Sequence, residues 1–288
     1  MNKKSELYVI IAAVLWGFIG VGVTGLTNCG ISRTSIGFVR AFTAFVSLAA
    51  YLFFTDKSAF RLKLKDLWCF FGTGVVGLLL FNICYFNAMK MTSIAVAAVL
   101  LYTAPAFVII LSAILFKEKI TSVKIVSMCA MFAGCVLVSG VFEGGASFSA
   151  RGVIIGIMSG IGYALYSIFG RFALNRGYSS ATISLYTFAF AAMGGVFVSD
   201  FDAIVSSFGT QMVMYSLFIG VVCCLFPYLF YTKGMENIDN GRASVLAMAE
   251  PLVAAVVSVF IDGVPSVIKI CGMAVMFAGI AFMSLKKE

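Results

Sequence analysis

A single carboxylate, Glu250, stands well inside a long apolar stretch of the sequence and directly precedes Pro251. About seven residues separate it from the start of that stretch, which corresponds to about 10 Å along a helix. A charge at such a depth in lipid costs at least ~3 kcal/mol, so the side chain should face the interior of a helix bundle or be protonated. Three roles stay open for Glu250: counter-ion for a cationic group such as an ammonium, proton-coupling carboxylate, or structural hydrogen-bond partner of the kink at Pro251.

Arg40 is the second deep charge, about 12 Å from the end of its own apolar stretch by the helical rise. Arg33 lies seven residues earlier, on the same helical face. The depths of Arg40 and Glu250 differ by roughly 8 Å in an apolar membrane core of ~30 Å. An ion pair between them stays an alternative, although the two side chains would have to bridge this difference. Arg side chains extend toward the membrane surface, which favours a structural anchor over a contact with a substrate carboxylate.

Polar aromatic residues and one amide recur inside the apolar stretches, and each polar tip needs a partner there. Asn82 and Tyr85 share one helix face. Taken singly, each of these residues is better explained by packing between helices than by substrate contact. Together they predict an aromatic cavity that suits a compact organic solute better than a bare ion. With Glu250, the candidate substrate-binding residues are Trp16, Asn82, Tyr85, Tyr102, Tyr163, Tyr166 and Tyr228.

Pro105 and Pro251 each lie inside an apolar stretch and free the carbonyls of Leu101 and Ala247. A freed carbonyl in lipid is tolerated where neighbouring helices or a water-filled cavity satisfy it. Paired kinks therefore indicate a central cavity with gating helices, although membrane helices also tolerate proline without function.

Several classes of site are excluded by composition. The chain has no His, so imidazole metal sites and Ser/His or Cys/His nucleophile systems are not expected. Gly-Lys never occurs, which removes the phosphate-binding loop of nucleotide-driven pumps. The eight Cys form no C-x-x-C pair and are interpreted as small apolar residues. We expect no metal, no cofactor, no catalytic residue and no nucleic-acid partner.

The elements that position these residues are membrane spans. Of the 288 residues 62% are hydrophobic and only 11% charged, which is less than half the charged fraction of about 25% in soluble proteins. Apolar runs of 18 or more residues predict spanning helices. The sequence predicts an all-α integral membrane protein with ten spans: Glu6–Thr27, Ser32–Thr55, Leu67–Met89, Ser93–Phe116, Ser122–Val141, Gly152–Leu174, Ser180–Ser199, Gln211–Thr232, Ala243–Ile261 and Ser266–Leu285.

The basic residues predict the orientation of these spans. With ten spans the side that holds both termini carries 15 Lys and Arg and the other side 5. The positive-inside rule then places both termini in the cytoplasm. The first span follows Lys3 and Lys4 and is too long for the apolar part of a signal peptide, so we expect it to be retained.

The two halves of the chain show internal repetition. Met131-Phe132-Ala133-Gly134 recurs as Met276-Phe277-Ala278-Gly279, and at an offset of 146 residues Pro105 falls on Pro251. Five spans per copy is an odd number, so the second copy must be inverted, which is the architecture of secondary transporters. We expect one repeat over residues 1–141, a connecting loop over 142–151 and the inverted repeat over 152–288.

These features resemble the EamA-type branch of the drug/metabolite transporter superfamily over essentially the whole chain. The resemblance is carried by Trp16-Gly17, Arg40, Leu101-Tyr102-Thr103-Ala104-Pro105, Lys117-Glu118-Lys119-Ile120-Thr121, the Met131 to Gly134 segment and Glu250-Pro251. Asp262-Gly263-Val264-Pro265 stands where the first half has Glu118, so the second half departs from the pattern. The resemblance implies export of amino acids or other small metabolites by alternating access.

The combined expectation is a multi-pass secondary transporter in the cytoplasmic membrane of a prokaryote, not an enzyme. Its substrate is expected to be an amino acid or related zwitterion moved outward, with a proton as the alternative coupling ion. Import of a nucleoside, vitamin or other metabolite and multidrug export are alternatives; a channel or an intramembrane lipid-modifying enzyme is disfavoured. Duplication within one chain makes a monomer sufficient, with the small-molecule substrate and the lipid bilayer as its partners.

Overall fold

The computed structural model of the protein describes residues 3–143 and 149–286, and all regular elements in these ranges are helical. Ten helices in the described ranges are long and apolar enough to cross a membrane: Lys3–Asn28, Arg33–Thr55, Leu64–Met91, Ile94–Phe116, Ser122–Glu143, Ala150–Leu174, Ser180–Val198, Thr210–Met235, Asn240–Ile261 and Val267–Leu285. These ranges agree with the predicted spans to within a few residues, so the all-helical membrane class and the ten spans are confirmed. The centre of the predicted loop 142–151 lies outside the described residues.

Some spans are single helices and others are divided. The undivided ones are α3 (Arg33–Thr55), α8 (Ser122–Val138), α9 (Ala150–Leu174), α10 (Ser180–Gly195) and α16 (Val267–Leu285). The divided ones are α1 (Lys3–Trp16) with α2 (Ile19–Asn28), α4 (Leu67–Phe71) with η3 (Gly72–Leu80) and α5 (Phe81–Met91), α6 (Ile94–Leu101) with α7 (Ala104–Phe116), α12 (Thr210–Leu217) with η6 (Phe218–Leu225) and α13 (Phe226–Met235), and α14 (Asn240–Ala247) with α15 (Ala249–Asp262). The remaining elements are short helices. Four are 3-10 helices and one is an α-helix: η1 (Lys57–Phe60), η2 (Leu64–Asp66), η4 (Val141–Glu143), η5 (Val196–Val198) and α11 (Phe201–Ser206).

Polar residues at the edges of the apolar runs start many of these helices. The Ser93 hydroxyl accepts a hydrogen bond from Val96 N at 3.2 Å, and the Asp239 carboxylate accepts one from Arg242 N at 2.8 Å. Such N-caps satisfy backbone N–H groups that have no partner within the helix. The capping residues Ser93 and Asp239 therefore determine the residues at which α6 and α14 begin.

The two halves place their helix irregularities at corresponding positions. Helices α6 and α14 begin 146 residues apart, and each ends a few residues before a proline in the first turn of the next helix. The π-helical segments η3 and η6 also begin 146 residues apart, at Gly72 and Phe218. The repetition seen in the sequence is thus accompanied by a repetition of local helix geometry.

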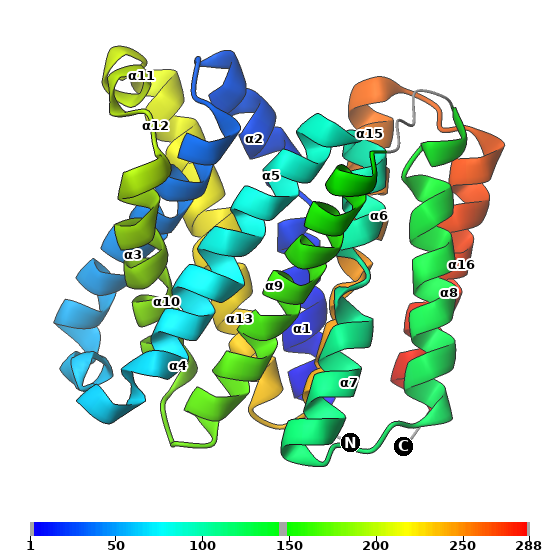
Figure 1. The fold of residues 1–288 in the computed structure, drawn as a ribbon, viewed down its shortest axis with the longest axis horizontal. Coiled ribbons are helices and arrows are strands. Elements are labelled where there is room, and N and C mark those ends of the chain that lie inside the picture. Colours follow the sequence, from blue (N-terminus) through cyan, green and yellow to red (C-terminus); the bar gives the residue numbers. More distant parts are fainter. Residues whose placement is uncertain (1–2, 144–148, 287–288) are drawn as a thin grey trace.

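Helices α8 and α16 pack closely through the repeated glycine segments and stand side by side at one edge of the molecule (Figure 1). A Cβ placed on Gly134 would clash with Met276, and one placed on Gly279 would lie 2.7 Å from Met131 Cγ. The contacts are reciprocal, and they pair later residues of one helix with earlier residues of the other. The two helices therefore run antiparallel.

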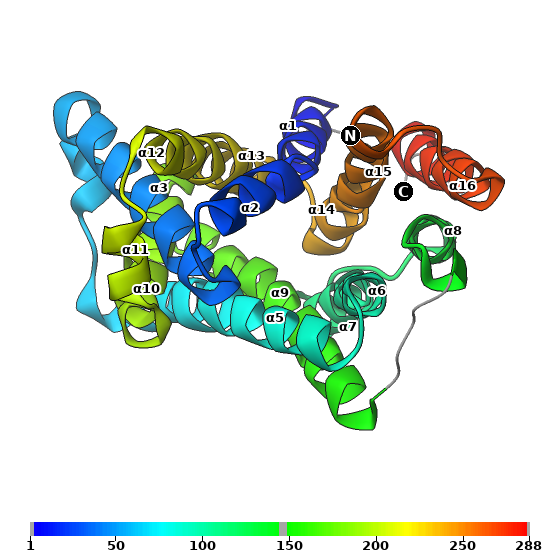
Figure 2. The same ribbon diagram turned by 90° about the horizontal axis from the view of Figure 1, so that it is seen from above.

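The described chain begins and ends at the same end of the bundle, called here the terminal end (Figure 1). The ends of α2, α5 and α15 and the starts of α3, α6 and α16 lie at the other, opposite end (Figure 1). Viewed from that end, α1 and α2 lie between α3 on one side and α15 on the other (Figure 2). This arrangement brings residues from both halves around the centre of the molecule.

Candidate ligand-binding cavity

A cavity of about 590 Å³ lies among α1, α2, α3, α5, α6, α8, α15 and α16. Its wall includes Arg33, Ile94 and Lys269, which belong to helix starts at the opposite end of the bundle. The cavity therefore extends from the middle of the bundle to the opposite end. Its size falls within the range of about 300–1,000 Å³ that is typical of small-molecule sites.

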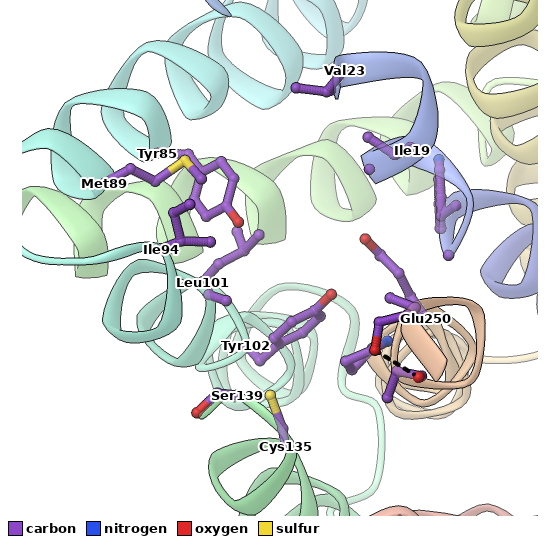
Figure 3. Close-up of a pocket in the computed structure, with 18 of the residues that line it drawn as sticks. Ile19, Val23, Tyr85, Met89, Ile94, Leu101, Tyr102, Cys135, Ser139 and Glu250 are labelled. Carbon is purple, nitrogen blue, oxygen red and sulfur yellow. Dashed lines mark hydrogen bonds between the residues drawn. The ribbon is translucent and has the colours of Figure 1, made fainter. Parts of the chain in front are cut away.

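The wall brings together seven residues singled out from the sequence: Trp16, Arg40, Asn82, Tyr85, Tyr102, Glu250 and Pro251. Figure 3 shows the hydroxyls of Tyr85 and Tyr102 and the carboxylate of Glu250 turned toward the same open space. The remaining wall is largely apolar, with polar groups at a few points. That composition suits an organic molecule held in place by a small number of directed contacts.

Glu250 lies in the first turn of α15, directly after the break that follows α14. The N-terminus of a helix carries a partial positive charge, which stabilises a carboxylate there. No cation among the described residues lies within ion-pair distance of it. The break thus presents a carboxylate without an ionic partner to the cavity.

Arg40 reaches the same cavity from α3 and is only 6% exposed. It forms no ion pair with Glu250 in the described part of the chain, in line with the difference in depth inferred from the sequence. The cavity therefore holds one buried positive and one negative side chain that are not bound to each other.

Three predicted aromatic residues do not reach the wall. The Trp16 ring lies 6.4 Å from Tyr163 and 5.3 Å from Tyr228 between ring centroids, and the Tyr166 hydroxyl bonds to Thr232 at 2.8 Å. Tyr163, Tyr166 and Tyr228 form the packing behind Trp16 instead. Their phenol groups hold the cavity wall in place from the protein interior.

Asn82 has a structural contact in addition to its place on the wall. Its amide nitrogen donates to the Leu78 carbonyl at 2.5 Å. That carbonyl belongs to the π-helical segment η3, where the regular hydrogen-bond pattern is changed. One side of the Asn82 amide is therefore engaged with the backbone.

Pro105 lies in the first turn of α7 and away from the cavity wall. The carbonyl of Leu100, in the last turn of α6 just before the break, accepts from the Thr103 hydroxyl at 2.7 Å. Gly160 of α9 covers this break so closely that a Cβ there would lie 3.1 Å from the Leu100 oxygen. A glycine at position 160 thus allows α9 to close over the break.

At the terminal end, one segment joins several helices through polar contacts. Glu118 accepts from Asn240 N at 2.9 Å and from Gly241 N at 3.2 Å, and Lys124 pairs with Asp239 at 2.9 Å. Arg171 donates to the Asn240 side chain at 2.8 Å. None of these residues lines the cavity, so residues 238–242 form a closed polar hub on the side away from it.

This hub also includes the ion pair between Arg242 and Glu6, at 2.8 Å. Both side chains are buried. Burial raises the pKa of Glu118, and its bonds from the backbone N–H groups of Asn240 and Gly241 oppose that shift. The hub is therefore held by charges that are taken out of water and partnered within the protein.

Sequence reasoning did not select several cavity residues. Lys269 lines the outer part of the cavity and pairs with Glu143 at 2.7 Å, and Cys135, Ser139 and Ser258 also lie on the wall. Arg33 could have been selected, because it shares a helical face with Arg40. The small residues gave no signal, since apolar stretches contain many like them. Among the described residues no group of acidic, Cys or His side chains could hold a metal ion.

Comparisons with known proteins agree with this architecture. The family model described as "EamA-like transporter family" matches residues 3–140 and again residues 150–285. A protein of Archaeoglobus fulgidus described as "Uncharacterized transporter" is 27% identical over 96% of this chain and 95% of its own length. A Bacillus subtilis protein described as "Uncharacterized transporter YxxF" is 25% identical over 100% of this chain and 91% of its own.

One solved structure, titled "Crystal structure of protein", shares the fold. It superimposes with a TM-score of 0.81 and covers 99% of this chain and 98% of its own, at 20% sequence identity. The ten-helix arrangement described above is therefore also found in a solved structure.

Proposed function

Since the chain belongs to the EamA-like transporter family, as a multi-pass protein of the plasma membrane, we propose that it is a secondary transporter for an amino acid or related small zwitterion. The observation that carries this proposal is the Glu250 carboxylate, which faces the cavity without a cation partner among the described residues. A substrate ammonium would supply the missing positive charge. The hydroxyls of Tyr85 and Tyr102 would orient the molecule, and the apolar wall would receive its side chain.

The proposed mechanism is alternating access between two inverted halves. The antiparallel packing of α8 against α16 and the matching positions of the helix breaks support a pseudo-twofold relation between the halves. Under this proposal the halves rock about a site at their interface, which lies near the middle of the membrane.

We further propose that the terminal end faces the cytoplasm, as the division of 15 to 5 basic residues favours. The cavity then faces outward while the polar hub at residues 238–242 closes the cytoplasmic side. We propose export as the direction: a substrate bound from the cytoplasm in the alternate state would leave through this outward opening.

Ligand binding to the purified full-length protein tests the substrate class. We expect a saturable rise in melting temperature with one chemical class of amino acids, because a ligand that binds only the folded protein stabilises it. Transport of the same compounds is then measured in liposomes that contain the protein. Absence of binding and transport for all amino acids, with binding of nucleosides or vitamins instead, would overturn the zwitterion proposal but not the transporter fold.

The variant Glu250→Gln tests the role of the carboxylate. Loss of the charge opposite an ammonium should weaken the apparent affinity at least about tenfold, while the fold is retained. The matched control is Phe260→Leu on the same helix, because Phe260 is 86% exposed on the outside of the bundle. Unchanged transport by Glu250→Gln would remove Glu250 from both the substrate and the coupling roles.

A further inference from the structure

Five charged side chains are buried in the described part of the protein: Glu6, Arg40, Asp66, Lys124 and Arg242. Four of them have an ionic partner. Arg242 pairs with Glu6 at 2.8 Å, Lys124 with Asp239 at 2.9 Å and Asp66 with Arg176 at 3.1 Å. Arg40 is the exception, because no described carboxylate lies within ion-pair distance of its guanidinium.

The surroundings of Arg40 do not replace the missing partner. Its Nε atom is buried and has no hydrogen-bond partner. The guanidinium has a hydrogen bond with the Cys224 side chain, and Cys223 and Tyr228 are the other ionisable groups that act on it. Thiols and phenols are neutral near pH 7 unless strongly activated, so these neighbours do not balance the charge.

Such an arrangement is costly for a folded protein. An arginine stays protonated in proteins, so Arg40 cannot escape the cost of burial by losing its proton. A buried charge whose partner is absent is strongly destabilising relative to a paired one. A purely structural anchor would be expected to have its acceptors within the protein, as Lys124 and Arg242 do. Arg40 has only a thiol and an unsatisfied Nε instead, and the missing negative acceptor points to a ligand.

The position of Arg40 defines where that ligand must lie. Arg40 and Glu250 line one cavity but come from α3 and α15, which lie on opposite sides of α1 and α2 (Figure 2). The space between them holds no charge pair of its own. A molecule with a carboxylate and an ammonium close together, as an α-amino acid carries them on one carbon, would bring a negative group to Arg40 and a positive group to Glu250 at once.

We propose that Arg40 binds the carboxylate of the transported molecule while Glu250 receives its ammonium. This assignment rests on the proposed transport of a zwitterion and adds the residue that requires the acidic group. The planar guanidinium can donate two parallel hydrogen bonds to a carboxylate, which fixes orientation as well as charge. The cavity then rejects amines and amides without a carboxylate, because they leave Arg40 unpartnered.

The test compares related ligands on the full-length protein. L-Phenylalanine, phenylalaninamide and 3-phenylpropanoate differ only in the carboxylate or the ammonium, and the corresponding three compounds of L-leucine provide a second side chain. The wild-type protein should bind the amino acid at least about 30-fold more tightly than its amide. Arg40→Met should lose this preference, whereas Glu250→Gln should keep it and lose the preference over the deaminated acid.

Stability without ligand provides a second measurement that separates binding from structure. If Arg40 awaits a ligand, Arg40→Met removes an uncompensated buried charge, and its melting temperature without ligand should equal or exceed that of the wild type. A lower melting temperature together with an unchanged preference for acid over amide would show a structural anchor and overturn the proposal.

Two further variants complete the design. Arg40→Lys keeps the charge but not the planar fork and should restore only part of the preference. Arg61→Gln removes a guanidinium that is exposed and outside the cavity, and it should retain the full preference. Equal effects of Arg61→Gln and Arg40→Met would show a general effect of net charge and overturn the assignment. If the wild type binds none of the six compounds, the zwitterion proposal itself fails, and this assignment fails with it.

Discussion

Glu118 shows how one residue links the end of one helix to the start of another. It follows α7 and caps the N-terminus of α14 through two backbone N–H groups. The cap satisfies donors that α14 cannot satisfy by itself, but it requires a carboxylate in a partly buried place. The raised pKa of Glu118 reflects this burial, which exceeds the effect of the two hydrogen bonds.

The raised pKa makes a prediction about stability and pH. A carboxyl whose pKa is higher in the folded than in the unfolded protein binds more protons when folded, so its contribution to stability declines as pH rises. The decline should begin near the ordinary value of about 4.3 and end above the raised pKa. We therefore expect the melting temperature of the wild type, relative to Glu118→Gln, to fall as pH rises through this window.

Parallel melting curves of both proteins across this pH range measure the effect. Glu236→Gln serves as the control, because Glu236 is an exposed carboxylate paired with Lys233 in the same region. A difference between wild type and Glu118→Gln that stays constant or grows with pH would contradict the assigned cause. The sequence showed Glu118 only as part of a family motif, since its partners lie more than 100 residues away.

At the scale of the helical elements, the spans followed from the sequence because lipid selects long apolar runs. The breaks near Pro105 and Pro251 could be expected as well, since proline removes a helix hydrogen bond. The π-helical segment η3 could not, because it contains no proline, and the proline that follows η6, Pro227, was not singled out. Asn82 shows the same limit: its polarity was visible, but its bond to Leu78 depends on that local geometry.

The same limit explains which aromatic residues reach the cavity. Trp16, Tyr85 and Tyr102 line it, while Tyr163, Tyr166 and Tyr228 pack behind it. All six have a polar tip inside a span, so composition cannot separate them. The rotation of each helix about its own axis decides the outcome, and neighbouring helices set that rotation.

The break between α14 and α15 should matter more for transport than the break between α6 and α7. Pro251 directly follows Glu250, whereas Ala104 stands before Pro105. Pro251→Ala allows the helix to continue through the break and to move the carboxylate. A displacement of about 1 Å can reduce activity by up to 100-fold, so we expect at least a tenfold loss of transport in liposomes. Pro105→Ala is the matched control and should lose less; equal losses would indicate that both breaks act only through flexibility.

For the whole molecule, the two ends differ in how they can close. The terminal end is joined by Glu118, Lys124 and Asp239 around the start of α14. Under the proposed inverted repeat, the corresponding closure at the opposite end would join the start of α6 to residue 264. That residue is Val264, which is 93% exposed and cannot cap a helix. The difference favours the state seen here, in which the terminal end is closed.

This asymmetry can be tested by supplying the missing cap. Val264→Glu gives the opposite end a carboxylate that can accept from the first N–H groups of α6 when that end closes. Hydrogen bonds to a charged group contribute about 1.5–3 kcal/mol, so the population with an open cavity should fall about tenfold or more. A single Cys at Ser258 on the cavity wall, in a protein without its native Cys, reports this population through its reaction with a membrane-impermeant thiol reagent.

Two further variants test the coupling between the ends. Glu118→Ala weakens the closure of the terminal end, so it should also slow labelling of the cavity, and the two changes together should slow it further. Val264→Gln separates the charge from the added size, because a neutral amide accepts more weakly. Faster labelling in Val264→Glu than in the parent would show that the opposite end does not close when it gains a cap. The proposed rocking of inverted halves, in which one end closes as the other opens, would then fail.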